Sequence, residues 1–353
     1  MKINVMALAQ GRARWFLLGL LLTAPFWTGA LLGPYWVRIL DYCLLYAILA
    51  LGLNIVVGYA GLLDLGFIAF YAVGAYVFAL LASPHWDLHW SPWLILPIAA
   101  AIAAVVGAIL GAPTLRLRGD YLAIVTLGFG EIVRLFINNL DRPINITNGP
   151  QGISGIDTLS IGGWSFDQGL NLGVVNLVSA QLYFYVLLAL VIVAVVACLR
   201  LENSRIGRAW VAIREDEVAA TAMGINTRNM KLLAFAMGAS FGGVGGVLFA
   251  SFQGFVSPES FTLMESIMVL CMVVLGGMGH IPGVLLGAFL LPITPEILRE
   301  VISPLQQQLF GHQVVDPENL RMLLFGLSMI LVMLYRPGGL WPSARRAQEL
   351  KHD

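Results

Sequence analysis

The sequence predicts an all-α polytopic membrane protein with about ten transmembrane or re-entrant helices. Of its 353 residues, 59% are hydrophobic and only 11% are charged, and the mean hydropathy is +0.84. A soluble domain is closer to half apolar and a quarter charged. The apolar residues also gather into runs of about 20, the length that a helix needs to cross a bilayer. Such runs and short loops would use up the chain, so we expect one integral membrane domain over residues 1–353.

Ten apolar runs without a sustained load of charge follow one another along the chain. They lie near residues 15–33, 38–58, 63–82, 93–112, 120–139, 181–200, 231–253, 262–280, 283–301 and 320–336. The first run follows basic residues, as the apolar part of a signal peptide does. Its cleavage-site chemistry is poor and further runs follow, so we interpret it as a retained helix.

Basic residues indicate the orientation, because the cytoplasmic loops of membrane proteins are enriched in Lys and Arg. With the first residue inside, the outer segments hold only Arg38, Arg142, Arg299 and Arg321, and Arg134 lies within a run. That leaves 15 of the 20 basic residues inside. The asymmetry predicts both termini in the cytoplasm and an even number of spans.

Composition and motifs exclude several functional classes. The formal net charge is zero, from 20 basic and 20 acidic residues, which argues against a nucleic-acid binder. The only lysines are Lys2, Lys231 and Lys351, and none follows a glycine. The chain therefore has no P-loop for ATP. The three cysteines lie far apart in apolar runs. We expect no cofactor bound by this chain, no metal site and no catalytic residues.

Two outer segments are unusual. Residues 140–180 form a long, Gly-rich loop, and loops of this length are usually functional or disordered. In a shorter loop, His85 and His89 flank Asp87, which suggests metal binding. Trp86 and Trp90 beside them favour instead a segment at the membrane interface.

Two glycine-rich stretches interrupt the apolar runs. Residues 58–66 hold three glycines and the carboxylate of Asp64, and residues 276–283 hold four glycines and Pro282. Non-helical backbone survives at membrane depth only where it is buried in protein or lines a cavity. Transporters use such breaks to present backbone groups to a substrate. A tight connection at the membrane surface is the alternative interpretation for each stretch.

Polar side chains within the runs point to a route across the membrane. Glu131 and Arg134 are three residues apart and would share one face of a helix. Since charges in a span are costly, they pair with each other or face a water-filled route, and both interpretations are open here. Two glycines between Thr126 and Glu131 are expected to loosen this helix. The candidate residues of a pathway are Asp64, Thr126, Glu131 and Arg134, with Asp41 and Glu265 in weaker context.

The inner segment 201–230 is the one sizeable cytoplasmic loop, and it carries the densest charge in the chain. From Trp210 onward, apolar positions alternate with the charges of residues 214–217, and Gly224 is a suitable C-terminal stop. The pattern predicts one short amphipathic helix. It lies either in a groove of a cytoplasmic partner or in solvent.

Several motifs, all in the same order, resemble those of LivM-type permease subunits of branched-chain amino acid ABC importers. They are 51–58 (LGLNIVVG), 60–66 (AGLLDLG), 115–134 (LRLRGDYLAIVTLGFGEIVR), 206–210 (IGRAW) with 214–217 (REDE), 258–261 (PESF) and 275–279 (LGGMG). The resemblance covers about residues 40–342.

This resemblance implies the fold of the branched-chain amino acid, urea and ribose permease superfamily, in a bacterial inner (plasma) membrane. It implies a second related permease subunit, two cytoplasmic ATPase subunits that hydrolyse ATP, and a periplasmic binding protein that delivers leucine, isoleucine or valine. The chain itself would be no enzyme but a transport subunit in the lipid bilayer. The implied ATPase-coupling residues are Arg214, Glu215, Asp216, Glu217, Ala219, Ala220 and Gly224.

The chain departs from the family pattern in two places. The importer signature E-A-A-x-x-x-G is interrupted here by Val218, which puts the role of Glu217 in doubt, and Asn148 stands where glycine is common. Two other functions are compatible with the sequence. One is the permease of a urea or amide ABC importer, and the other is a proton-coupled secondary transporter that uses Asp64 or Glu131.

Overall fold

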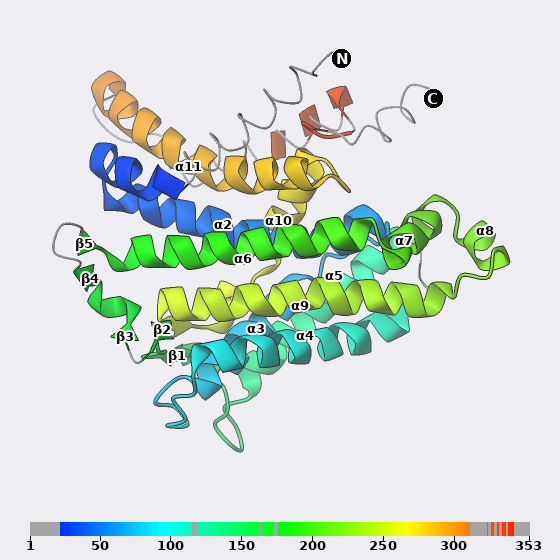
Figure 1. The fold of residues 1–353 in the computed structure, drawn as a ribbon, viewed down its shortest axis with the longest axis horizontal. Helices are drawn as coiled ribbons and strands as arrows, with labels where there is room; N and C mark the ends of the chain where they lie inside the picture. Colours follow the sequence, from blue (N-terminus) through cyan, green and yellow to red (C-terminus); the bar gives the residue numbers. More distant parts are fainter. Residues whose placement is uncertain are drawn as a thin grey trace, which may run out of the picture.

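Long apolar helices run side by side along the molecule in the computed structural model (Figure 1). The structure describes residues 22–114, 117, 119–162, 164–171 and 176–310, and short pieces between 323 and 341. Within these residues, six helical segments are long and apolar enough to cross a membrane. They are Pro34–Tyr59, Pro92–Thr114, Ser179–Glu202, Thr227–Gln253, Pro258–Gly276 and Ile281–Glu300.

The predicted runs correspond to helices, but the predicted count of about ten spans is not confirmed. Helices α2 (Pro34–Asn54), α4 (Pro92–Thr114), α5 (Asp120–Asn139), α6 (Ser179–Glu202) and α9 (Thr227–Gln253) cover five of the runs. Helices α3 (Ile68–Leu81), α10 (Leu263–Gly276) and α11 (Ile281–Phe310) cover three more. Of the first run, residues 15–21 lie outside the described part, and the last run is described only in pieces.

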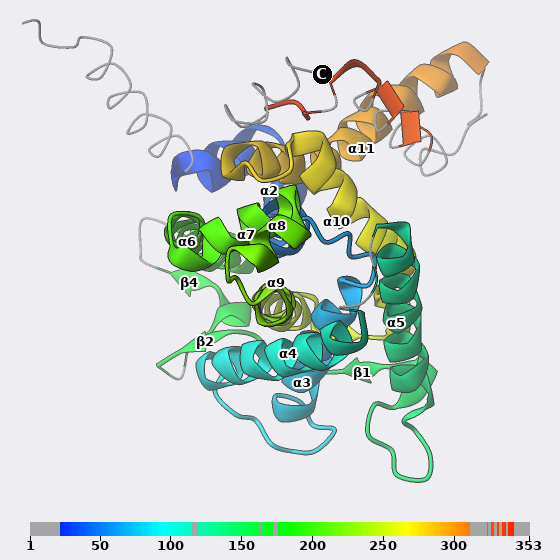
Figure 2. The same cartoon turned by 90° about the vertical axis from the view of Figure 1, so that its right-hand side faces the viewer.

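Helix α9 lies in the middle of the bundle, and glycines make this possible (Figure 2). A Cβ on Gly246 would collide with the carbonyl of Tyr71 in α3, and one on Gly243 would press against Ala99 and Ala103 in α4. A Cβ on Gly238 would collide with Val56. Small residues let helix backbones approach closely in a membrane, where lipid offers no hydrophobic drive for association.

The first interruption separates α2 from α3. A π-helical turn, η1 (Ile55–Tyr59), follows α2, and residues 60–67 are largely non-helical before α3 begins at Ile68. The 14 residues of α3 span about 21 Å at 1.5 Å per residue, less than the thickness of about 30 Å of a bilayer core. The helix of the predicted span 63–82 therefore begins later than expected, and the first part of the span is largely non-helical chain inside the protein.

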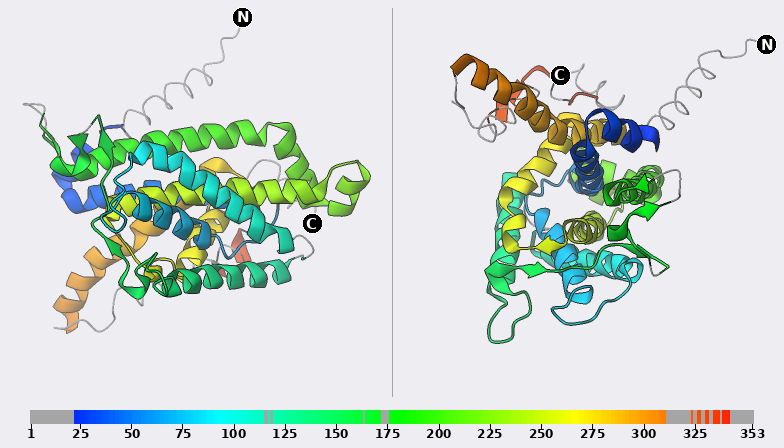
Figure 3. Two further views of the ribbon diagram at one scale, coloured as in Figure 1. Left: turned by 90° about the horizontal axis from the view of Figure 1, so that it is seen from below. Right: turned by 90° about the vertical axis from the view of Figure 1, so that its left-hand side faces the viewer.

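The second interruption separates α10 from α11. Gly277 and Gly279 have positive φ angles of 123° and 81°, which turn the chain sharply between the two helices. Backbone N–H groups of Leu340 and Trp341 donate to the carbonyls of Leu275 and Gly276 at 2.8 and 3.1 Å. Helix α11 then leaves the bundle at an angle (Figure 3).

Short strands and turns gather at one end of the molecule (Figure 1). Most lie in the segment 149–177: η2 (Gly149–Gln151), β1 (Ile153–Ser154), β2 (Ser160–Ile161), β3 (Trp164–Ser165), η3 (Phe166–Gln168), β4 (Leu170–Asn171) and β5 (Asn176–Leu177). Strand β1 pairs antiparallel with β6 (Phe255–Val256), β2 with β3, and β4 with β5. A further turn, η4 (Pro258–Ser260), precedes α10.

Helices α7 (Arg205–Glu215) and α8 (Glu217–Ala222) occupy the opposite end (Figures 1 and 3). The sequence predicts one helix here, and this expectation is wrong because Asp216 interrupts it. Asp216 is extended, with φ −153° and ψ 111°, and its carboxylate accepts the N–H groups of Val218 and Ala219. It thus caps a second helix, which ends before Gly224 at φ 84°.

Candidate functional site

The first interruption brings Asp64 against Thr126 in the middle of α5. The Thr126 hydroxyl accepts the N–H of Leu65 at 3.0 Å, and the Asp64 carboxylate accepts the N–H of Gly66 at 2.9 Å. Asp64 is buried, with 1% of its surface exposed. Polar side chains thus bind backbone groups that a helix would have paired internally, as a non-helical segment at this depth requires.

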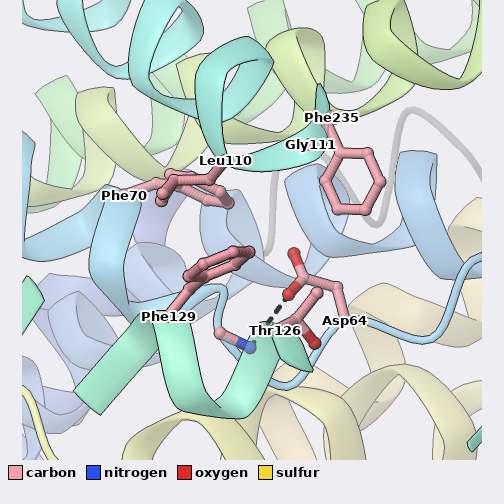
Figure 4. A pocket seen from close by; sticks show the side chains of 8 residues that line it. Asp64, Phe70, Leu110, Gly111, Thr126, Phe129 and Phe235 are labelled. Atoms are coloured by element: carbon pink, nitrogen blue, oxygen red, sulfur yellow. Dashed lines mark hydrogen bonds between the residues drawn. The ribbon is translucent and has the colours of Figure 1, made fainter. Parts of the chain in front are cut away.

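Aromatic side chains surround the Asp64 carboxylate on its other side. Phe70 of α3, Phe129 of α5 and Phe235 of α9 line a small cavity next to it (Figure 4). The cavity volume of about 10 Å³ is at the lower limit for one water molecule. The space next to the Asp64 carboxylate is therefore too small for anything larger than a water molecule.

Glycines allow the interruption to lie directly on α5. A Cβ on Gly66 would collide with the Thr126 carbonyl, and a Cβ on Gly130 would lie 3.2 Å from the Cα of Gly66. Helix α5 itself is continuous from Asp120 to Asn139. The expectation that its glycines loosen the helix is wrong, because Gly130 serves this contact and a Cβ on Gly128 would meet no atom within 4 Å.

Glu131 and Arg134 form a pair on the face of α5 next to the chain that leads into α10. The Arg134 guanidinium donates to the Glu131 carboxylate, with a shortest distance of 2.6 Å. It also donates to Glu259 of η4 at 3.2 Å. One guanidinium is thus held between two carboxylates, and Glu259 is a site residue that the sequence analysis did not single out.

A larger cavity of about 160 Å³ lies beside Glu131. It is separate from the small cavity at Asp64, and Leu65 lines it while the neighbouring Asp64 and Gly66 line the small one. The four pathway candidates are therefore brought together as two pairs, Asp64 with Thr126 and Glu131 with Arg134. The segment 64–66 forms the wall between their cavities.

The weaker candidates lie elsewhere, on α2 and at the start of α10. Asp41 is fully buried in α2, and its carboxylate oxygens have no hydrogen-bond partner among the described residues. Glu265 accepts the hydroxyl of Tyr46 at 2.8 Å.

Side-chain contacts hold the predicted coupling segment against the N-terminal part of α9. The indole N–H of Trp210, a fully buried side chain of α7, donates to the carbonyl of Met230 at 2.7 Å. In α8, Glu217 forms an ion pair with Lys231, whose side chain is 6% exposed. The Trp210 hydrogen bond and this partly buried ion pair hold α7 and α8 against the first turns of α9, so the three form one packed unit.

Arg214 joins this unit to both interruptions. Its guanidinium donates to the carbonyl of Gly58 at 2.6 Å, and its side chain packs on Gly61. The side chain of Asn54 in turn accepts the N–H of Gly279 at 2.8 Å, and a Cβ on Gly58 would collide with that same N–H. Because Gly58, Gly61 and Gly279 carry no side chain, the first interruption, the second interruption and Arg214 of α7 can lie in direct contact.

The remaining coupling candidates are mostly on the surface. Glu215, Asp216, Ala219 and Gly224 are exposed, as are the apolar side chains of Val218 and Met223, at 66% and 83%. Ala220 is buried, with 4% of its surface exposed. The coupling segment thus presents an apolar and acidic surface at the end of the molecule where α7 and α8 lie.

Comparison with known proteins identifies the family. The family model described as the branched-chain amino acid transport system permease component matches residues 35–333, which is most of the chain. The chain belongs to this permease family. The family predicted from the motifs is thereby confirmed, and so is membership of a class of transport subunits.

The permease is 44% identical to the high-affinity branched-chain amino acid transport system permease protein LivM of Escherichia coli K12, over 96% of this chain and 77% of that protein. It is 29% identical to the permease protein BraD of Pseudomonas aeruginosa, over 84% of this chain and 91% of that protein. It is 27% identical to the permease protein LivH of Escherichia coli K12, over 73% and 83%. No solved structure matches the permease.

Proposed function

We propose that this permease is the membrane-spanning subunit of an ATP-driven importer that moves leucine, isoleucine and valine into the bacterial cytoplasm. The similarity to LivM, 44% identity over 96% of the chain, carries the proposal. The weaker similarity to LivH supports pairing with a second, related permease subunit. Two cytoplasmic ATPase subunits and a periplasmic binding protein complete the importer, and this chain binds no cofactor.

The energy of ATP enters through the coupling segment. The exposed surface of α7 and α8 docks on an ATPase subunit, with both termini of the permease on the same cytoplasmic side. ATP binding closes the ATPase pair and moves this surface. Because Trp210 and Lys231 fix the segment to α9 and Arg214 fixes it to Gly58, the motion reaches α9 and the first interruption. A ligand that binds one of two arrangements more tightly shifts the population toward it.

The translocation route runs past Asp64, Thr126, Glu131 and Arg134. A zwitterionic amino acid needs a few charged or polar groups for its head and apolar surface for its side chain. In this structure the segment 64–66 closes on α5 through Thr126, so movement of the interruption away from α5 opens the route toward the cytoplasm.

Reconstitution tests the function. The permease is inserted into liposomes with its second permease and ATPase subunits, and uptake of labelled leucine is measured with the binding protein outside and ATP inside. Uptake that requires ATP and survives an uncoupler supports the proposal. Uptake that an uncoupler abolishes and that needs no ATPase indicates a secondary transporter. Uptake of urea or short amides in place of amino acids indicates the sister group of importers.

Bulky substitution tests the docking surface. Ala219→Trp adds a large side chain on the exposed face of α8, and we expect it to weaken ATPase binding and leucine uptake. Ala220→Trp is a poor test because Ala220 is buried against the chain itself. Ile161→Trp, at the 53% exposed Ile161 of β2 at the opposite end of the molecule, controls for insertion. Normal uptake by Ala219→Trp, with ATPase subunits bound and active, would rule out docking at this face.

A further inference from the structure

The 160 Å³ cavity beside Glu131 has the composition of a pocket for an aliphatic group. Most of its wall is made by large apolar side chains from the first interruption, α3, α5 and α10. These are Leu65, Ile68, Leu127, Phe261 and Leu263. An apolar cavity of about 150 Å³ holds a molecule the size of benzene, so this one has room for the four carbons of a branched aliphatic side chain.

Charge is placed at one side of the cavity only. Of the described residues that line it, Glu131 alone is charged, and Arg134 lies one turn further along α5. With Glu259, the cluster has two carboxylates and one guanidinium, so an excess negative charge remains. That excess suits an ammonium group.

Arg134 also retains hydrogen-bonding capacity. A guanidinium has five N–H donors. Here Nε and one N–H of Nη2 bond Glu131, and one N–H of Nη1 bonds Glu259. Among the described residues, the second N–H of each terminal nitrogen has no partner, and these two can donate to a carboxylate because the Arg134 side chain is 22% exposed.

We propose that this cavity receives the side chain of the transported aliphatic amino acid. The α-ammonium group binds at Glu131, and the α-carboxylate accepts the two remaining N–H groups of Arg134. This site rests on the proposed importer function and adds a selectivity element within the permease. The binding protein would thus not be the sole determinant of which amino acids enter.

The segment 64–66 forms one wall of the proposed site. Leu65 contributes to the wall of the cavity, while its N–H is bound by Thr126. Since the same interruption is tied to Arg214 at Gly58, movement of the coupling segment changes the wall that the substrate side chain contacts. Substrate release and ATPase movement are thereby linked through one short stretch of chain.

Changing the size of the cavity tests the proposal. Leu127→Phe makes it smaller and Leu127→Ala makes it larger, and the matched controls Ile124→Phe and Ile124→Ala change a 64% exposed residue one turn away on α5. The complete importer is assayed with one binding protein and labelled leucine, valine and alanine. One methylene in an apolar pocket changes selectivity by about tenfold or more. We therefore expect Leu127→Phe to lower the leucine-to-alanine ratio of uptake about tenfold. We expect Leu127→Ala to raise the uptake of leucine, the largest of the three, relative to the other two.

A second measurement covers variants that assemble poorly. Leu263→Cys places a thiol on the cavity wall, while the native Cys43, Cys198 and Cys271 are buried. In the full complex, we expect leucine to slow maleimide labelling of this thiol, and glycine to do so less.

The outcomes separate the two proposals. Wild-type uptake with unchanged selectivity in both Leu127 variants, and no protection of the thiol by leucine, would overturn the cavity proposal alone. Wild-type importer that takes up no branched-chain amino acid would overturn the proposed function itself.

Discussion

Single side chains in this permease join segments that are far apart in sequence. Arg214 bonds Gly58 across 156 positions, Asn54 bonds Gly279 across 225, and Arg134 bonds Glu259 across 125. Arg214 and Asn54 hydrogen-bond to backbone groups at the interruptions, and Arg134 hydrogen-bonds to a carboxylate. Because local patterns carry no information on such partners, the sequence predicted Arg214 as a docking residue but not its contact with Gly58, and it did not single out Asn54 or Glu259.

Arg214→Gln is expected to uncouple ATP hydrolysis from transport. A hydrogen bond to a charged group contributes about 1.5–3 kcal/mol, so its loss should lower leucine uptake roughly tenfold while ATP hydrolysis continues. Arg208→Gln is the matched control, because Arg208 is exposed on the same helix and bonds only the nearby carbonyl of Asn203 among the described residues. Equal uptake and equal ATPase activity in both variants would exclude a role for the Arg214 contact.

Glu131→Gln and the double variant Glu131→Gln/Arg134→Gln are expected to lower ATP-driven leucine uptake at least about tenfold. The single change removes the carboxylate that binds the ammonium group, and the double change removes the whole pair. Uptake and insertion into the membrane are measured together, with Asn139→Gln, at the end of the same helix, as the control. If the double variant transports leucine normally, the pair has a structural role only.

A titratable contact ties the loop of His89 to the loop of Asp157. The His89 ring bonds the Asp157 carboxylate at 2.7 Å, and this hydrogen bond and the attraction to Asp157 raise the pKa of His89 above its usual value. The contribution to stability is therefore full below the ordinary histidine pKa, near 6.5, and is lost as pH rises through the raised value. We expect amide exchange of residues 83–90, corrected for intrinsic rates, to accelerate over that range in wild type but not in Asp157→Asn.

At the scale of elements, apolar length predicts a helix better than it predicts its ends. The runs at 93–112, 181–200 and 231–253 correspond closely to α4, α6 and α9, because long apolar segments must pair their backbone groups internally in a membrane. The run at 63–82 contains a non-helical stretch in which the N–H groups of Leu65 and Gly66 bond Thr126 and Asp64. The break at Asp216 depends on the helix cap that this one side chain makes, and the periodicity of apolar residues does not indicate such a cap.

Two glycines at the same level of the bundle offer a test of the first interruption. Gly66→Ala places a methyl group against the Thr126 carbonyl, whereas Gly128→Ala on α5 meets no atom within 4 Å. Overpacking costs about 1–3 kcal/mol, while Ala favours a helix over Gly by about 1 kcal/mol. Thermal unfolding of the purified complex should therefore show a lower Tm for Gly66→Ala and an equal or higher Tm for Gly128→Ala. Equal Tm values for the two variants would contradict a close contact between Gly66 and α5.

At the scale of the whole molecule, the structure has two distinct ends, and the basic residues predict which of them faces the cytoplasm. The strands β1–β5 gather at one end and α7 and α8 at the other (Figure 1). The predicted orientation places 15 of the 20 basic residues, and with them the α7–α8 end, on the cytoplasmic side. The zero net charge of the chain is compatible with this predicted uneven distribution of its basic residues across the membrane.

Single cysteines at the two ends test this orientation. Ile144→Cys lies in the 140–180 loop, where Ile144 is 72% exposed, and Arg228→Cys lies at the exposed start of α9. In intact cells with a permeable outer membrane, we expect a membrane-impermeant maleimide to label Ile144→Cys and not Arg228→Cys. Inverted vesicles should give the reverse pattern, which also shows that both thiols are reactive. Labelling of Arg228→Cys from outside would invert the assigned topology, and the coupling segment would then face away from any cytoplasmic ATPase.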